Sequence, residues 1–225
     1  KAILWTDGRY FLQAEKQLEG SVVELYKMME PGVPTINEFL KANLKKSEKL
    51  GMDGKVVAVS SFDSMEKELE GIELVTNTDL IGEIWENRPQ AVLSEAFILE
   101  EKYTGKSAKE KIEEVRSMLT EKKADSTVIG ALEDVCYLFN VRGRDVRCNP
   151  VVTAYAIVDK TRAIIFISEK QLTDKVKSYF ASQGTMVMGY EDVFAEAAKL
   201  TGKVYLDPSR TNVYLYSQIK ANIEK

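Results

Sequence analysis

Two charged residues at the end of a predicted strand could contact a ligand. Asp7 and Arg9 flank a glycine within residues 5–11. An acid and a guanidinium at such a place could bind a polar ligand, because the loops that follow strands often carry function. The pair could instead form an ion pair that only fixes the turn into the following helix. The sequence leaves both interpretations open.

A second group of candidates lies in residues 140–150. Arg142 could present its planar guanidinium to a carboxylate, or it could pair locally with Asp145 or Glu133. Asn149 precedes a proline at a strand entry, where it could cap a turn or touch a substrate. The candidate residues for substrate access or an interface are therefore Asp7, Arg9, Arg142, Asp145 and Asn149.

The chain lacks the residue types that most hydrolases use. It has no histidine, which is the usual general base and the commonest metal ligand. It has only two cysteines, Cys136 and Cys148, so we expect reduced thiols and neither a disulfide framework nor a zinc site. The 35 carboxylates lie mostly among lysines on helix faces, as at Glu110 and Lys111, and we interpret them as solvated surface. We predict no catalytic residue, no metal ligand and no cofactor in this chain.

Composition and charge exclude two classes of partner. Hydrophobic residues make up 44% and charged residues 29% of the 225, which is ordinary for a globular protein. A net charge of −4 argues against a general nucleic-acid binder, which needs a clustered basic excess. No apolar run approaches the roughly 20 residues of a membrane-spanning helix. We therefore expect neither nucleic acid nor membrane as a partner.

The elements that position these residues alternate between strands and helices, which favours an α/β fold. In the first half we predict strands at residues 2–6, 22–26, 55–59 and 72–75 and helices at 9–18, 35–44, 61–69 and 80–85. Thr35 and Glu38 fit a capping box, and Ser107 is a second N-cap. In the second half we predict strands at residues 96–99, 127–130, 151–158, 162–168, 186–188 and 203–206, and helices at 107–119, 132–139, 171–183, 191–200 and from about 209.

The two halves show a weak internal repeat. The strand at residues 2–6 and its helix match the strand at 163–167 and its helix. Each is followed by a strand, a helix and a strand that ends in aspartate, at residues 50–53 and 204–207. The comparison predicts that the first domain lacks roughly fifty residues at its N-terminus, and a start in mid-strand leads us to expect a fragment. Chance similarity between two α/β stretches is the alternative.

Several of these segments resemble the three-domain, cytosolic-type Xaa-Pro aminopeptidases, also called aminopeptidase P. Similar segments are residues 5–15, 31–35 with 39–40, 79–81 with Trp85 and 88–89, 103–107 with Lys111, and 138–145 with 149–150. Tyr137 stands where the family usually has tryptophan, and Val151 and Val152 follow the Asn-Pro pair where an aromatic residue is common. The resemblance implies two creatinase/prolidase N-terminal-like domains, each a mixed sheet flanked by helices. We expect an N-terminally truncated domain I at residues 1–91 and domain II at 92–225.

The resemblance also implies a function. The family comprises cytoplasmic metallopeptidases, hydrolases that release an N-terminal residue preceding proline. A C-terminal pita-bread domain binds two divalent metals, commonly manganese, through two aspartates, a histidine and two glutamates. The chain would then be a non-catalytic part, inactive alone, that shapes substrate access and dimerisation. Its partners would be its own pita-bread domain, a second copy in a homodimer and proline-containing peptides.

Two other interpretations remain. The chain could be a peptidase-like protein-interaction module with no enzymatic role. It could also belong to another pita-bread enzyme, such as a dipeptidase or amidinohydrolase. The latter fits less well, because those enzymes usually have one such N-terminal domain and this sequence indicates two.

Overall fold

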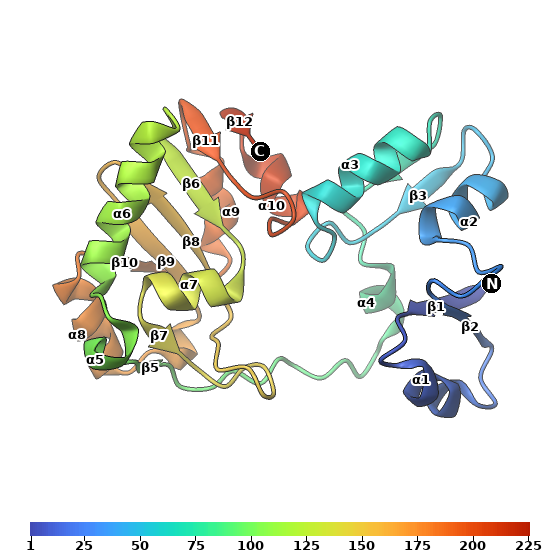
Figure 1. The fold of residues 1–225 in the computed structure, drawn as a ribbon, viewed down its shortest axis with the longest axis horizontal. Coiled ribbons are helices and arrows are strands. Elements are labelled where there is room, and N and C mark those ends of the chain that lie inside the picture. Colours follow the sequence, from blue (N-terminus) through green and yellow to red (C-terminus); the bar gives the residue numbers. More distant parts are fainter. The chain divides into compact units, whose positions relative to one another are not determined.

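The computed structural model describes all 225 residues, and its internal contacts divide the chain into two compact units (Figure 1). Unit 1 comprises Lys1–Leu50 and Asp63–Val75, and unit 2 comprises Gly51–Phe62 and Thr76–Lys225. No helix in either unit has the length and apolar character needed to cross a bilayer.

Unit 1 is built around two small sheets. Strand β1 (Ala2–Thr6) runs parallel to β2 (Val23–Lys27), and helix α1 (Phe11–Leu18) makes the crossover that a parallel pair requires. The remaining elements are α2 (Ile36–Asn43), β3 (Lys49–Gly51), which pairs with β4 (Glu73–Val75), and α3 (Val59–Glu68), which begins in residues assigned to unit 2.

An aromatic cluster holds α2 against the β1–β2 sheet. The rings of Trp5, Tyr26 and Phe39 meet edge to face, with centroids 5.0 to 5.9 Å apart, a geometry that aromatic pairs favour. The predicted capping box at the start of α2 is confirmed, because the Thr35 side chain accepts from the Glu38 backbone and the Glu38 carboxylate accepts from the Thr35 backbone.

Unit 2 contains a six-stranded mixed sheet, which confirms the predicted α/β class. The strand order is β10-β9-β8-β6-β11-β12. Strand β8 is antiparallel to β6 and β9, and the other neighbouring pairs are parallel. The strands are β6 (Ser126–Ile129), β8 (Ala154–Asp159), β9 (Ala163–Ile167), β10 (Met186–Met188), β11 (Lys203–Tyr205) and β12 (Asn222–Glu224).

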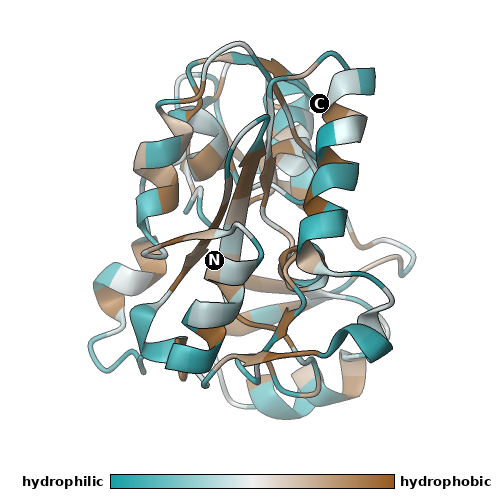
Figure 2. Cartoon of the chain, turned by 90° about the vertical axis from the view of Figure 1, so that its left-hand side faces the viewer, coloured by the Kyte–Doolittle hydropathy of each residue, from teal (hydrophilic) through white to brown (hydrophobic).

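Helices cover both faces of this sheet (Figure 2). Side chains alternate along a strand, so Ile165 packs on one face with α6, α7 and α8, whereas Ile164 packs on the other with α9 and α10. Unit 2 contains α4 (Leu80–Ile84), α5 (Glu101–Thr104), α6 (Ala108–Glu121), α7 (Leu132–Leu138), α8 (Asp174–Ser182), α9 (Asp192–Ala197) and α10 (Val213–Gln218). Of these, α6 to α10 pack on the sheet. A two-stranded pair, β5 (Phe97–Ile98) and β7 (Val141–Arg142), completes the unit.

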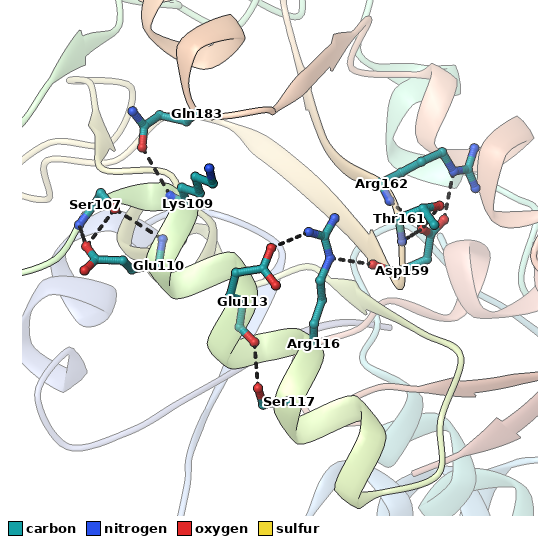
Figure 3. Close-up of polar contacts among 10 residues, drawn as sticks. All are labelled: Ser107, Lys109, Glu110, Glu113, Arg116, Ser117, Asp159, Thr161, Arg162 and Gln183. Carbon is teal, nitrogen blue, oxygen red and sulfur yellow. Dashed lines mark hydrogen bonds and ion pairs between the residues drawn. The ribbon is translucent and has the colours of Figure 1, made fainter.

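Polar contacts hold helix α6 at its N-terminus and within its C-terminal half (Figure 3). Ser107 and Glu110 form a capping box at its N-terminus. In its C-terminal half, Arg116 donates from Nε to the carbonyl of Asp159 at 3.1 Å, and from Nη1 to the carboxylate of Glu113 at 2.6 Å. Asp159 also accepts from the backbone of the β8–β9 turn, so α6 and this hairpin are held in one arrangement.

The structure corrects three of the predicted elements. The strand predicted at residues 55–59 is wrong: this stretch is turns and a bend, and Val59 already begins α3. These residues do make strand-like hydrogen bonds, since the Val59 N–H donates to the Thr211 carbonyl and the Val57 carbonyl accepts from the Val213 N–H. The pairing stops there, so it forms an isolated bridge and not a strand. The helix at 171–183 is split into a 3₁₀ turn (Glu169–Gln171) and α8, and the last helix starts at Val213, where Asn212 caps it. Strands β7 and β12 were not predicted.

Candidate functional site

Asp7 and Arg9 form a two-point ion pair at the turn between β1 and α1. Asp7 Oδ1 accepts from Arg9 Nε at 2.9 Å and from the Arg9 backbone at 3.0 Å, and Oδ2 accepts from Nη2 at 2.8 Å. The side-chain hydrogen bonds from Arg9 lower the pKa of Asp7 to about 2. Both side chains remain exposed. The structure therefore shows the turn-fixing pair, and a role in substrate access stays a prediction.

Arg142 ends strand β7, its guanidinium contacts the last turn of α7, and it makes no ion pair. Its Nη1 donates to the carbonyls of Cys136 at 2.5 Å and Val141 at 2.9 Å. The alternative that paired Arg142 with Asp145 or Glu133 is wrong, because these helix and strand carbonyls take its donors instead. The guanidinium thus gives a partner to the Cys136 carbonyl, which lies in the last turn of α7, where carbonyl groups lack partners within the helix.

Asp145 joins three segments that are far apart in the sequence. Oδ1 accepts from the backbone and the hydroxyl of Ser94, both at 2.9 Å. Oδ2 accepts from the Thr153 backbone at 2.7 Å and from Gln171 Nε2 at 2.8 Å. Burial would raise the pKa of Asp145, but the hydrogen bonds from Ser94 and Thr153 outweigh it, and the net pKa is lowered. The carboxylate therefore stays ionised and organises this loop.

The side chain of Asn149 contacts α7 at the protein surface. Its Nδ2 donates to Glu133 Oε1 at 2.9 Å, and its backbone bridges to Val146. The loop around it lines a hollow of about 290 Å³ that also includes Arg144 and Cys148. Arg142 and Asn149 thus contact α7 at separate points, at Cys136 and Glu133. Asp145 has other partners, and Asp7 and Arg9 belong to unit 1.

A buried lysine is the main feature that sequence reasoning missed. Lys111 lies among carboxylates on a helix face that we expect to be solvated, but it is 2% exposed. Its Nζ donates to Asn140 Oδ1 at 2.7 Å and to the Tyr137 carbonyl at 2.9 Å, and lies 3.7 Å from the Tyr137 ring centroid. Burial and the nearby Arg142 charge lower the pKa of Lys111. The available signal was its spacing, since Lys111 is four residues before Val115 on the apolar stripe of α6.

The residues present do not fit a two-metal centre. No group of three or more histidine, cysteine, aspartate or glutamate side chains is placed to hold a metal ion. The ligand set implied by the resemblance includes a histidine, and the chain has none. Both cysteines are free thiols, Cys136 buried and Cys148 exposed.

Comparisons with known proteins agree with the predicted resemblance. Family models described as creatinase/prolidase N-terminal domain match residues 1–84 and, separately, residues 87–225. Xaa-Pro aminopeptidase 1 of Dictyostelium discoideum is 36% identical over 96% of this chain and 36% of its own length. A probable Xaa-Pro aminopeptidase P of Coprinopsis cinerea is 39% identical over 86% of this chain and 32% of its own length.

A solved structure is similar over nearly the whole chain. It is an X-prolyl aminopeptidase from Caenorhabditis elegans, described as a cytosolic enzyme with a di-nuclear active site. The TM-score is 0.89 at 30% identity, covering 98% of this chain and 38% of that one. This chain thus spans about a third of the length of its relatives and corresponds to the N-terminal part of Xaa-Pro aminopeptidases. It belongs to the creatinase/prolidase N-terminal domain family and carries two regions that match this family.

Proposed function

We propose that this chain is the non-catalytic N-terminal part of a metal-dependent aminopeptidase that releases an N-terminal residue preceding proline. The similarity over 98% of the chain to a cytosolic X-prolyl aminopeptidase carries this proposal. The absence of a metal-ligand cluster supports the non-catalytic role. The metals, commonly manganese, would be held by a C-terminal pita-bread domain, and the whole protein would act in the cytoplasm.

We also propose two domains, residues 1–91 and 92–225. The family models, which match residues 1–84 and 87–225, support a boundary near this point. The two compact units divide the chain differently, because Gly51–Phe62 and Thr76–Ala91 group with the larger unit. Limited proteolysis tests the boundary. A major cut near residues 85–95 supports it, and resistance of that stretch with cuts elsewhere counts against it.

In this proposal the two domains restrict access to the active site and contribute to a homodimer. Candidates for these contacts are Asp7, Arg9, Arg142, Asp145 and Asn149. The two-stranded sheet of unit 1 supports self-association, since β1 and β2 each keep one edge with no strand hydrogen-bonded to it. Sedimentation velocity at rising concentration should show a dimer, and a monomer at all concentrations would count against this part.

The full-length product of the gene is the reagent that tests the function. We expect it, loaded with manganese, to release the first residue of an Xaa-Pro peptide and to leave a matched Xaa-Ala peptide intact. We expect the 225-residue chain to release none under the same conditions. A peptidase-like interaction module would give no hydrolysis with either protein, so the same assay separates the two candidate functions.

A further inference from the structure

A crevice in unit 2 lies at the ends of two neighbouring parallel strands, where the segments that follow these strands lead to helices on opposite faces of the sheet. Strands β6 and β11 are parallel neighbours. The chain after β6 enters α7, which packs on one face, and the chain after β11 leads to α10 on the other face (Figure 1). In open α/β sheets, such a switch point at the carboxyl ends of strands is where ligands bind.

Two cavities occupy this switch point. The first has a volume of about 320 Å³ and lies between α6, α7 and the ends of β6 and β11. The second, about 330 Å³, lies beside it, and both are lined by Gly130, Ala131, Arg210 and Thr211. The first is mainly apolar, and its volume is at the small end of ligand-binding pockets. Its apolar lining includes Val115, Met118, Ile129, Leu138 and Tyr205.

The charged groups of the first cavity differ in whether they already have partners. The Lys111 ammonium donates a hydrogen bond to Asn140, and the Glu114 carboxylate forms an ion pair with Lys106. The Asp207 carboxylate accepts from the backbone and hydroxyl of Ser209.

Asp134 on α7 and Arg210 in the loop after β11 are the exceptions. Neither side chain makes a hydrogen bond or an ion pair, and both residues are exposed. The positive charge of Arg210 interacts with the nearby carboxylates of Glu133 and Asp207 without a direct contact. The lining of the cavity therefore carries one carboxylate and one guanidinium that have no hydrogen-bonded partner in the protein.

A buried hydroxyl is also without a partner. Thr211 is 1% exposed, its Oγ1 makes no hydrogen bond, and the residue lines both cavities. Native structures leave few such groups unpaired, and each one calls for an explanation. The neighbouring backbone is tightly packed, since a Cβ on Gly130 would lie 2.6 Å from the Arg210 carbonyl. The loop that carries Arg210 and Thr211 is thus held close to the end of β6.

We propose that this crevice binds a free α-amino acid with a large apolar side chain. The carboxylate of the ligand would pair with Arg210, its ammonium with Asp134, and its side chain would enter the apolar cavity. The Thr211 hydroxyl would take a hydrogen bond that the protein alone does not supply. The site lies wholly in unit 2 and goes beyond the proposed function, so it does not depend on peptidase activity.

Ligand analogues test the assignment directly. We would titrate the ¹⁵N-labelled chain with L-leucine, leucinamide, which lacks the carboxylate, and 4-methylpentanoate, which lacks the ammonium. We expect saturable shifts at the Gly130, Ala131 and Thr211 amides with leucine, at a dissociation constant of about 1 mM or tighter. Each analogue should bind at least about tenfold more weakly, because it loses one charged hydrogen bond. Equal binding of all three compounds, or no shift at these amides, would overturn the proposal.

Variants test the residues. We expect Arg210→Gln and Asp134→Asn each to weaken leucine binding at least about tenfold. The matched controls are Arg144→Gln, an exposed arginine elsewhere, and Asp174→Asn, which like Asp134 lies in the first turn of a helix. Both controls should bind leucine as the unaltered chain does.

Thr211→Val separates binding from folding. Because valine removes the unpaired hydroxyl at similar volume, the chain should stay folded, and we expect weaker leucine binding. Unchanged binding in this variant, or in both charge variants, would refute the assigned contacts.

Discussion

The clearest structural prediction concerns Asp145, whose carboxylate accepts four hydrogen bonds. In Asp145→Asn one oxygen still accepts two bonds, but the new amide group faces two donors. Hydrogen bonds to a charged group contribute about 1.5–3 kcal/mol each, so losing two would cost about 3–6 kcal/mol. Rotation of the partly exposed side chain relieves some of this, and we expect a loss of about 2–4 kcal/mol in the free energy of unfolding.

The pH dependence of stability follows from the lowered pKa of Asp145. In the unfolded chain the carboxyl has its ordinary pKa near 3.8, so it binds protons more readily there than in the folded protein. Stability from this group is therefore present above pH 3.8 and is lost as the pH falls through the lower, folded pKa. The asparagine variant lacks this titration. We expect the stability difference between the two proteins to narrow as the solution is acidified.

Urea unfolding followed by far-ultraviolet circular dichroism measures the difference, and hydrogen exchange locates it. The Ser94 and Thr153 amides donate to Asp145, so their protection should fall in the variant. Asp174→Asn, an exposed acid at a helix start, is the control and should cost less than about 1 kcal/mol. Unchanged protection of both amides, or a loss no greater than that of the control, would refute the reasoning.

Two further predictions use the same chain. Lys111→Met should lower the free energy of unfolding by about 1–3 kcal/mol, because Asn140 and the Tyr137 carbonyl lose their donor. Removal of the buried charge, which is costly to desolvate, offsets part of this loss. If the variant and the unaltered chain unfold with equal free energies in urea, the hydrogen bonds of Lys111 make no net contribution to stability. In a thiol-labelling assay, Cys148 should react at once and Cys136 only on unfolding, because Cys136 is 1% exposed and burial raises the pKa of its thiol. Rapid labelling of both thiols in the folded protein would contradict the packing around α7.

Features set by neighbouring residues could be predicted from the sequence. The capping boxes at Thr35 and Ser107 each need only a hydroxyl and a glutamate three residues later. The β8–β9 hairpin followed from two apolar runs and the turn residues between them, whereas the mixed sheet was implied by the family resemblance. The Asp7–Arg9 pair was one of the two interpretations that the sequence left open, and it could be named because its partners are two residues apart.

Features that depend on distant residues could not be predicted. Residues 55–59 have the β-branched pattern of a strand, yet their partners are in the loop before α10, which supports only a bridge. The partners of Asp145 come from residues 94, 153 and 171, and no local pattern connects them. The switch-point crevice likewise draws its lining from α6, β6, α7 and the loop after β11.

Hydrolysis of an Xaa-Pro peptide by two purified proteins tests whether this chain is the non-catalytic part of an Xaa-Pro aminopeptidase. One is this 225-residue chain, and the other is the full-length gene product, both supplied with manganese and assayed for the released N-terminal residue. We expect the full-length protein to release the residue and this chain to release none, because this chain lacks a set of side chains able to hold two metals. Release of the N-terminal residue by this chain alone would contradict this expectation.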